Sequence, residues 1–197
     1  MNTKPNYNVV STLIPRGVKV LDLGCGDGTL LDMLRREKGV SGVGVEINQD
    51  MVLRSIEKGL SIIQDDIDEG LKAFCDKEYD FVILNQTLQS TEKPDYVIDE
   101  MLRVGKKVIV SFPNFGYWKI RAYLFFNGKM PKSEKLPYEW YNTPNIHLLT
   151  IKDFYEFCRK RNIKIEKTIF LTDSKETKIP MWDKINCDEA VFVVSRV

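Results

Sequence analysis

A glycine-rich turn is the stretch of this sequence best suited to holding a ligand. It reads "VLDLGCGDGT" (20–29), and Gly24, Gly26 and Gly28 let the backbone turn tightly and approach a ligand that a Cβ atom would block. No Lys followed by Ser or Thr comes after it, so a phosphate-binding P-loop is excluded. The spacing is GxGxG rather than GxGxxG, which weakens the case for a dinucleotide site without excluding one.

Acidic residues follow the turn at intervals that suit a nucleoside. Glu46 stands about 20 residues past the turn, where a carboxylate can accept both hydroxyls of a ribose. "DDID" (65–68) offers a carboxylate, Asp66, for the exocyclic amine of an adenine, and Asp22 lies where an amino-acid ammonium would bind. An adenosine joined to an amino acid is S-adenosylmethionine, so these residues predict that cofactor.

Two other interpretations of the acids remain. One is a metal cluster, which is the weaker of the two because no histidine lies near them in the sequence. The other is that Asp68 caps a helix at "DEGLKAF" (68–74). Both interpretations are compatible with a cofactor-binding role for Asp66.

Alternating strand and helix patterns must position these residues. Short β-branched or apolar runs predict strands, and apolar residues at helical spacing with Asn48 and Thr150 as N-caps predict helices. The predicted strands are 18–23, 41–47, 60–64, 79–85, 107–112, 163–171 and 189–197, and the predicted helices are 29–39, 48–58, 94–103 and 150–161. The alternation predicts a three-layer, Rossmann-like α/β fold around a seven-stranded, mostly parallel sheet. The last two strands, with no helix between them, are expected to be antiparallel neighbours at one edge.

Composition is that of an ordinary globular protein. At 197 residues with a net charge of +1, the chain fits a single domain over 1–197 and gives no global electrostatic case for nucleic acid or membrane. The N-terminal "MNTKPNYN" lacks the apolar core of a signal peptide. The four cysteines are scattered, with no CxxC pair, so we expect free thiols, no zinc site and a cytoplasmic location.

Several stretches carry a family resemblance. "VLDLGCGDGTLL", "GVGVEI" and "VILNQTLQ" resemble the class I S-adenosylmethionine-dependent methyltransferases. The run from Ser111 to Phe154, which includes "FPNFGYW" and "EWYNTPNIHLLTIKDF", and the terminal "EAVFVVSRV" resemble one family within that class, MetW, the methionine biosynthesis proteins. The resemblance covers nearly the whole chain.

The resemblance implies roles for individual residues. The backbone of Gly24 and Gly26 would hold the methionine portion of the cofactor and Asp22 its ammonium, while Glu46 would hold the ribose. Ile47 follows Glu46 in the same site, and Asp66 with the Ile67 backbone would hold the adenine. Asn85 and Gln86, at the end of the fourth strand, would line the floor beneath the sulfonium and methyl groups. The sequence departs from the usual pattern at Asp65, where glycine is more common, and we expect the turn to be altered there.

Aromatic side chains accumulate between the fifth predicted strand and the Thr150 helix, over about 113–149. We expect this insertion to be a lid over the cofactor or a surface for a partner, with Trp118, Trp140 and Tyr141 as its contact residues. Tyr123, Leu124 and Phe126 fit a buried helix face. From Met101 to Ser133 the chain has no acidic residue, so the insertion is also partly basic.

His147, the single histidine, lies in this insertion. Its side chain could act as a general base if a methyl acceptor needs to lose a proton. It could equally fix the loop before Thr150, and with no catalytic partner evident we favour this structural role.

Three functions are compatible with the sequence. The first, implied by the resemblance, is an S-adenosylmethionine-binding accessory or regulatory protein that acts with homoserine O-acyltransferase in methionine biosynthesis. The second is a methyltransferase that acts on an unidentified small molecule. The third, a nicotinamide dehydrogenase, rests only on Glu46 and the glycine turn.

Overall fold

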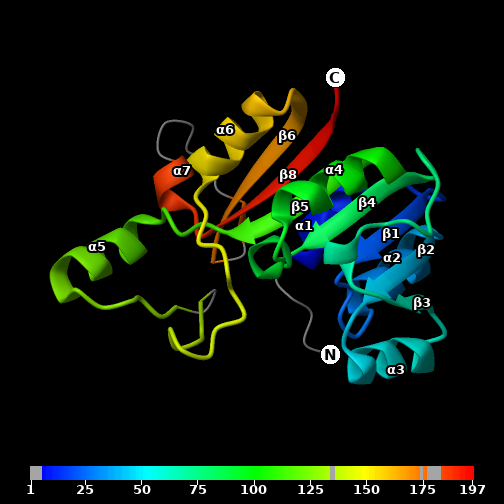
Figure 1. Ribbon diagram of the computed structural model, residues 1–197, viewed down its shortest axis with the longest axis horizontal. Helices are drawn as coiled ribbons and strands as arrows, with labels where there is room; N and C mark the ends of the chain where they lie inside the picture. The colour runs from blue at the N-terminus through cyan, green and yellow to red at the C-terminus, as the bar shows by residue number, and fades with distance from the viewer. Residues whose placement is uncertain (1–5, 134–135, 174, 177–182) are drawn as a thin grey trace.

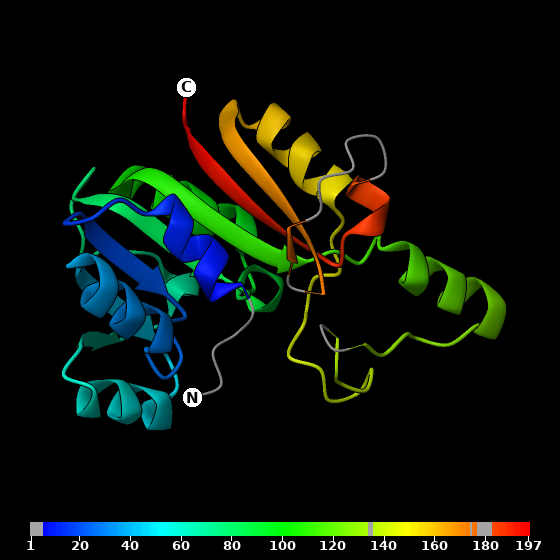
Figure 2. The same ribbon diagram turned by 180° about the vertical axis from the view of Figure 1, so that it is seen from behind.

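One mixed β-sheet runs through the molecule and carries helices on both faces (Figures 1 and 2). The computed structural model describes residues 6–133, 136–173, 175–176 and 183–197. Within them the sheet has eight strands in the order β3-β2-β1-β4-β5-β8-β6-β7. The strands are β1 Lys19–Leu23, β2 Ser41–Glu46, β3 Ser61–Gln64, β4 Tyr79–Asn85, β5 Gly105–Pro113, β6 Ile163–Thr172, β7 Lys175–Glu176 and β8 Glu189–Arg196. The eighth strand beyond the predicted seven is β7, which is only two residues long.

The sheet changes direction at its C-terminal strands. β3, β2, β1, β4 and β5 are parallel neighbours, whereas β8 pairs antiparallel with both β5 and β6. The last two long strands are therefore antiparallel neighbours, as the sequence predicts. The carboxyl ends of β1, β2 and β4 lie at one edge of the sheet, which brings the glycine turn, Glu46 and Asn85 together.

Two apolar cores form the layers. On one face, α4 (Pro94–Val104) and α6 (Ile151–Lys160) pack on the sheet through side chains such as Met101 and Phe154. On the other, α1 (Tyr7–Leu13) and α2 (Thr29–Lys38) pack through side chains such as Val10 and Leu34. Burial of such apolar side chains is the main force that holds the three layers together.

Two predicted helix starts, at Asn48 and Thr150, are confirmed. The Asn48 side chain accepts hydrogen bonds from the backbone N–H groups of Asp50 and Met51 at the start of α3 (Gln49–Glu57). Thr150 and Asp153 form a capping box at the start of α6. These caps satisfy backbone donors that have no partner within the first turn of a helix.

One predicted helix start is wrong. Asp66, not Asp68, caps at this place, and the element it caps is the three-residue 3₁₀ turn η1 (Ile67–Glu69). Asp68 instead accepts hydrogen bonds from the backbone N–H groups of Glu92 and Lys93, at 2.9 and 2.7 Å. The acid therefore joins two loops rather than starting a helix.

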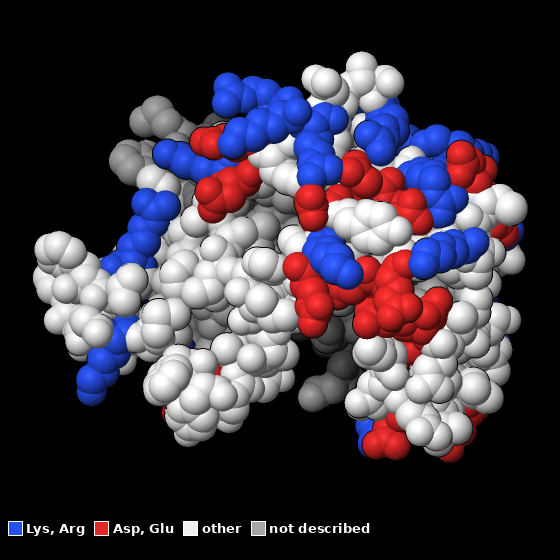
Figure 3. All heavy atoms as spheres, viewed as in Figure 1, with Lys and Arg blue, Asp and Glu red and all other residues white. Residues whose placement is uncertain are grey.

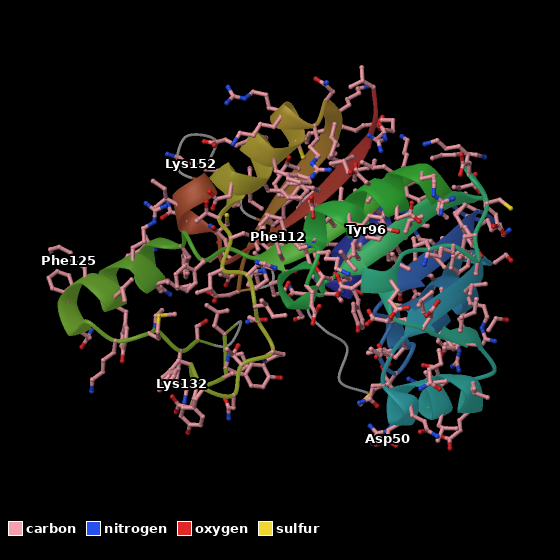
Figure 4. All side chains as sticks on the ribbon, in the orientation of Figure 1. Asp50, Tyr96, Phe112, Phe125, Lys132 and Lys152 are labelled. Atoms are coloured by element: carbon pink, nitrogen blue, oxygen red, sulfur yellow. The ribbon has the colours of Figure 1, made fainter. Side chains whose placement is uncertain are left out.

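The segment between β5 and α6, residues 114–149, projects away from the sheet, and we call it the arm (Figure 1). It contains α5 (Trp118–Asn127), and residues 134–135 fall outside the described part of the chain. Tyr123, Leu124 and Phe126, expected to be buried, are exposed, because α5 lies beyond the reach of the main cores. Figure 4 shows Phe125 at the far end of the arm, pointing into solvent.

The remaining described elements are the 3₁₀ turn η2 (Leu88–Ser90) after β4 and the short helix α7 (Asp183–Asn186) before β8. Among the described residues, no helix combines the length and apolarity needed to cross a membrane.

Candidate functional site

The glycine turn leaves β1 in a left-handed backbone conformation at three positions. Gly24, Gly26 and Gly28 have φ values of +63°, +58° and +72°. A Cβ atom on Gly24 would lie 2.7 Å from Thr87 Cγ2, and one on Gly28 would lie 2.4 Å from Leu60 Cδ1. A Cβ atom on Gly26 would meet nothing within 4 Å, so Gly26 faces open space. The turn is thus packed at its two ends and open at its centre.

Glu46 ties this turn to the end of β2. The side chain is 9% exposed, and its Oε2 accepts a hydrogen bond from the Gly26 backbone N–H at 2.8 Å. Its Oε1 accepts one from the Asn48 backbone N–H at 2.9 Å. Because a carboxylate oxygen can accept two hydrogen bonds, each oxygen keeps capacity for a ligand hydroxyl.

A cavity of about 390 Å³ lies beside Glu46. It brings together six of the residues singled out in the sequence, namely Gly24, Glu46, Ile47, Asp66, Ile67 and Gln86. Ile47 is 62% exposed and offers an apolar surface there. The cavity places this apolar side chain next to carboxylates, and we call it the adenosine-side cavity, after the part of the cofactor that the sequence analysis expects there.

Asp65 has a φ outside the left-handed region, and its Oδ1 accepts a hydrogen bond from the Asp66 N–H at 2.8 Å. An aspartate therefore fits at this position without strain. That the turn differs from one with glycine at this position stays a prediction.

A second cavity, of about 310 Å³, lies on the other side of Gly24. Asp22, Gly26 and Asn85 line it, and we call it the amino-acid-side cavity. Sequence reasoning missed, among its other lining residues, Tyr7, Met51 and Arg54, which come from α1 and α3. No motif marks them, because their place depends on how these helices pack against the turn.

A buried polar network lies beneath this cavity. Asn85 Oδ1 accepts hydrogen bonds from Asn6 Nδ2 at 2.7 Å and from Ser111 Oγ at 2.6 Å. Asn6 Nδ2 also donates to Oε1 of Glu189, a carboxylate that is fully buried at the start of β8. The network therefore joins the N-terminal segment, β4, β5 and β8 at one point.

Gln86 has a left-handed φ of +59°, which is costly for a residue with a Cβ. Its N–H donates to the Ser111 carbonyl at 3.1 Å and lies 3.0 Å from Ser111 Oγ, while its carbonyl accepts from Gln89 Nε2 at 3.0 Å. These bonds hold the strained residue at the edge of the adenosine-side cavity.

Burial sets the acidity of the site's own hydroxyl and thiol. Burial, reinforced by the nearby Asp22 carboxylate, raises the pKa of the Tyr7 hydroxyl well above its usual range. Burial likewise raises the pKa of the Cys25 thiol, with further contributions from Asp22 and Glu46. Because the thiolate is the nucleophilic form, Cys25 is a poor nucleophile despite its place in the turn.

Only part of the arm approaches the glycine turn in the described residues. Ile146 lines the adenosine-side cavity, but His147 lines a separate cavity between α4 and α6. Trp118, Trp140 and Tyr141 are 47%, 74% and 69% exposed and line none of these cavities. Figure 3 shows the arm as a largely uncharged surface with a few basic side chains, while acidic side chains gather over the body.

Within the described residues, no group of three or more His, Cys, Asp or Glu side chains is arranged to hold a metal ion. The acids of the turn region are engaged instead with backbone N–H groups, as Glu46, Asp66 and Asp68 show.

Structural comparison places the fold among known methyltransferases. The chain superposes on an S-adenosylmethionine-dependent methyltransferase of Thermotoga maritima, described as a possible histamine N-methyltransferase, with a TM-score of 0.68 at 19% identity, covering 98% of this chain and 88% of that one. A TehB-like S-adenosylmethionine-dependent methyltransferase of Corynebacterium glutamicum matches with a TM-score of 0.66 at 14% identity, covering 100% and 89%. At these identities the likeness establishes the fold alone.

Sequence comparison identifies the family. The chain is 37% identical over 195 residues to the bifunctional methionine biosynthesis protein MetXA/MetW of Rhodopirellula baltica, covering 93% of this chain and 31% of that protein. It therefore spans about a third of the length of this relative. The family model described as methionine biosynthesis protein MetW matches residues 4–194. The chain belongs to the MetW family.

Proposed function

We propose that this MetW-family protein binds S-adenosylmethionine at the carboxyl edge of its sheet and acts as an accessory or regulatory protein of homoserine O-acyltransferase. The observation that carries the first half is the pair of cavities on either side of Gly24, one bordered by Glu46 and Asp66 and the other by Asp22. The second half draws on the relative in which MetXA and MetW form one protein.

The residues present fit S-adenosylmethionine. Gly26 has space where a Cβ atom would stand, so a ligand can approach its backbone closely. Glu46 would hold the ribose hydroxyls with its remaining acceptor capacity, and Asp66 with the Ile67 backbone would hold the adenine. Asp22 and the amide of Asn85 border the cavity in which the amino-acid portion would lie. Bound there, the cofactor would supply an electrophilic methyl group.

The arm would be the contact surface for the acyltransferase. Trp140 and Tyr141 pack edge to face, with ring centroids 5.6 Å apart, and both are mostly exposed. Exposed aromatic side chains of this kind are enriched at the centres of protein interfaces. Lys119, Arg121 and Lys129 are exposed on the same segment, so the matching surface would be apolar with an acidic rim.

Cofactor occupancy would be communicated through Ile146. This residue of the arm lines the adenosine-side cavity, and its backbone N–H donates to the Gln89 carbonyl at 2.7 Å. A bound adenosine would contact the base of the arm directly. Because the cofactor is made from methionine, its binding would report the level of the pathway's end product to an early enzyme of the same pathway.

The test is the rate of homoserine O-acyltransferase with and without this protein, each with and without S-adenosylmethionine. We expect the protein to change the rate, the cofactor to change it further, and Glu46→Ala to abolish only the cofactor's effect. Trp140→Ala with Tyr141→Ala should abolish the effect of the protein itself. Leu53→Ala, which removes a 52% exposed side chain from α3, is the matched control and should behave as wild type. An unchanged acyltransferase rate in every arm of the assay would refute the accessory role.

A second candidate is a methyltransferase acting on an unidentified small molecule, which the completeness of the two cavities favours. It predicts release of S-adenosylhomocysteine when the protein is incubated with S-adenosylmethionine and candidate acceptors, including homoserine and its acyl esters. His147 would then be tested as a base, although it lies on a separate cavity. Absence of S-adenosylhomocysteine above the no-protein control would exclude this activity for the acceptors tried.

A further inference from the structure

A third cavity, of about 570 Å³, lies beside the adenosine-side cavity and is not part of it. Its floor is apolar and continuous with the main core, because Leu88, Ile98 and Phe154 are 3%, 2% and 2% exposed. Leu149 and Phe157 complete the floor. This volume and this lining are typical of sites that enclose small organic molecules. In Figure 3, uncharged surface below α6 and beside the arm is bordered by both acidic and basic side chains.

The charged groups around this cavity are acidic. Glu92, Asp95 and Asp153 line it, and none of its lining residues is a lysine or arginine. Asp95 is neutralised by Arg161, at 2.5 Å, and Asp153 is engaged in the capping box of α6. Glu92 has no side-chain hydrogen bond or ion pair to any described residue, so its carboxylate is the negative charge available to a ligand.

The His147 residue forms part of the cavity wall. Its Nε2 is buried and has no hydrogen-bond partner among the described residues. The residue is held in place because its backbone N–H donates to the Gln89 carbonyl at 3.0 Å. Because the protein already encloses this atom, the imidazole is a fixed part of the wall, and its environment changes when a ligand occupies the cavity.

We propose that this cavity is a second small-molecule site, which takes an organic amine with an apolar or aromatic body. The body lies on the floor formed by Leu88, Ile98 and Phe154 and against the His147 ring, and the ammonium pairs with Glu92. The acidic lining disfavours carboxylates and phosphates, since no cationic side chain faces them. This inference is independent of the proposed function, because it uses none of the residues assigned to the ribose or the amino-acid portion of the cofactor.

This cavity and the adenosine-side cavity lie next to each other and share a lining residue. Glu92 lines both this cavity and the adenosine-side cavity, and the consecutive residues Ile146 and His147 face one cavity each. The two sites therefore share a wall made by the base of the arm.

The single histidine makes the proposal directly testable. His147 gives the one histidine Hε1 resonance of the chain, so a change in its chemical shift reports binding at this wall without assignment of other signals. The probes are tryptamine, an aromatic amine with an indole N–H, and indole-3-propionate, which replaces the ammonium by a carboxylate. We expect tryptamine to shift the His147 resonance saturably and to bind at least tenfold more tightly than indole-3-propionate. Saturating S-adenosylhomocysteine should leave the tryptamine titration in place.

Variants test how much the negative charge of Glu92 contributes to the binding of the amine. Glu92→Gln should weaken tryptamine binding by about three- to tenfold, the loss expected for one charge-assisted hydrogen bond at a partly exposed site, and leave indole-3-propionate unchanged or improved. Glu57→Gln removes an exposed acid from α3 and should leave both titrations unchanged. The proposal is overturned if both probes bind equally, or if tryptamine binds without moving the His147 resonance. It is also overturned if S-adenosylhomocysteine displaces tryptamine stoichiometrically, or if a lysine-containing apolar peptide shifts the resonance where tryptamine does not.

Discussion

Glu46 Oε2 accepts a hydrogen bond from the backbone N–H of Gly26 at 2.8 Å, which joins the carboxyl end of β2 to the open centre of the glycine turn. Because the other oxygen accepts from the Asn48 N–H, both halves of this carboxylate already shape the site before any ligand arrives. Glu46→Gln therefore places an amide NH₂ against one of these two backbone donors. We expect it to lower the free energy of unfolding by about 1–3 kcal/mol and to weaken S-adenosylmethionine binding about tenfold or more.

Urea unfolding and calorimetric titration measure these two effects on Glu46→Gln separately. Glu57→Gln, the same chemical change at an exposed position of α3, provides a control for the loss of charge alone. Wild-type cofactor affinity in Glu46→Gln would mean that this carboxylate shapes the turn and does not hold the ribose.

Two glycines distinguish backbone strain from ligand contact. Gly26 and Gly39 have nearly the same left-handed φ, +58° and +64°, and a Cβ atom added to either meets nothing within 4 Å. Gly26→Ala and Gly39→Ala should therefore lower the free energy of unfolding by a similar amount, about 1–2 kcal/mol. Only Gly26 lines the amino-acid-side cavity, so only Gly26→Ala should abolish cofactor binding. Equal affinities of the two variants for S-adenosylmethionine would contradict the placement of the ligand at this turn.

Local patterns explain why most of the fold could be predicted. The strands that carry the site, and the caps at Asn48 and Thr150, depend on residues within a few positions of one another, and they were predicted to within two residues. The prediction that one face of α5 is buried was wrong, because burial depends on residues far away in the chain. The apolar residues of α5 cover all sides rather than one face, so their pattern suggests burial, whereas the arm lies too far from either core for burial to occur.

The unforeseen part of the site depends on contacts between residues far apart in the chain. Asn6 reaches Asn85 and Glu189 across 79 and 183 positions, and no local pattern encodes such a meeting. One sequence feature could have drawn attention to it, namely an acid, Glu189, that opens the apolar strand "EAVFVV" and is fully buried there. Buried carboxylates need hydrogen-bond donors, so a partner for Glu189 could have been sought.

The same network yields a stability prediction. Asn6→Ala removes donors to Asn85 Oδ1 and to the buried Glu189 carboxylate. Because two buried acceptors each lose a donor, we expect the free energy of unfolding to fall by about 2–3 kcal/mol. Asn127→Ala, which removes an exposed asparagine at the end of α5, should change it by less than about 0.5 kcal/mol. Equal values for the two variants, measured by urea unfolding, would show that the network adds no stability.

Thiol reactivity should distinguish one cysteine from the other three. Cys75 is exposed, whereas Cys25, Cys158 and Cys187 are buried, and burial raises the pKa of Cys158 to about 12. In the folded protein, a chromogenic disulfide reagent at pH 8 should therefore titrate one thiol rapidly, and all four only after denaturation. Cys75→Ser should remove the fast phase entirely. A fast thiol that remains in that variant would contradict the burial of the other three cysteines.

The ion pair between Glu100 and Arg103 predicts how stability depends on pH. The Arg103 side chain, through its hydrogen bonds, holds the pKa of the Glu100 carboxyl below its usual value of 4.5, against the opposing effect of burial, and the Leu71 N–H adds to the lowering. A carboxylate whose pKa is lower in the folded state stabilises the protein fully at pH values above its pKa in the unfolded chain. This contribution is lost as pH falls through its pKa in the folded protein.

Glu100→Gln should therefore be less stable than wild type at pH 7, by about 1–3 kcal/mol, because Arg103 and the Leu71 N–H lose a charged acceptor. The difference should shrink as pH is lowered below about 4.5, since wild type loses its carboxylate there and the variant has none to lose. Urea unfolding of both proteins between pH 7 and pH 3 measures this difference directly. A difference that stays constant over the whole range would mean that Glu100 stabilises the fold by packing rather than by its charge.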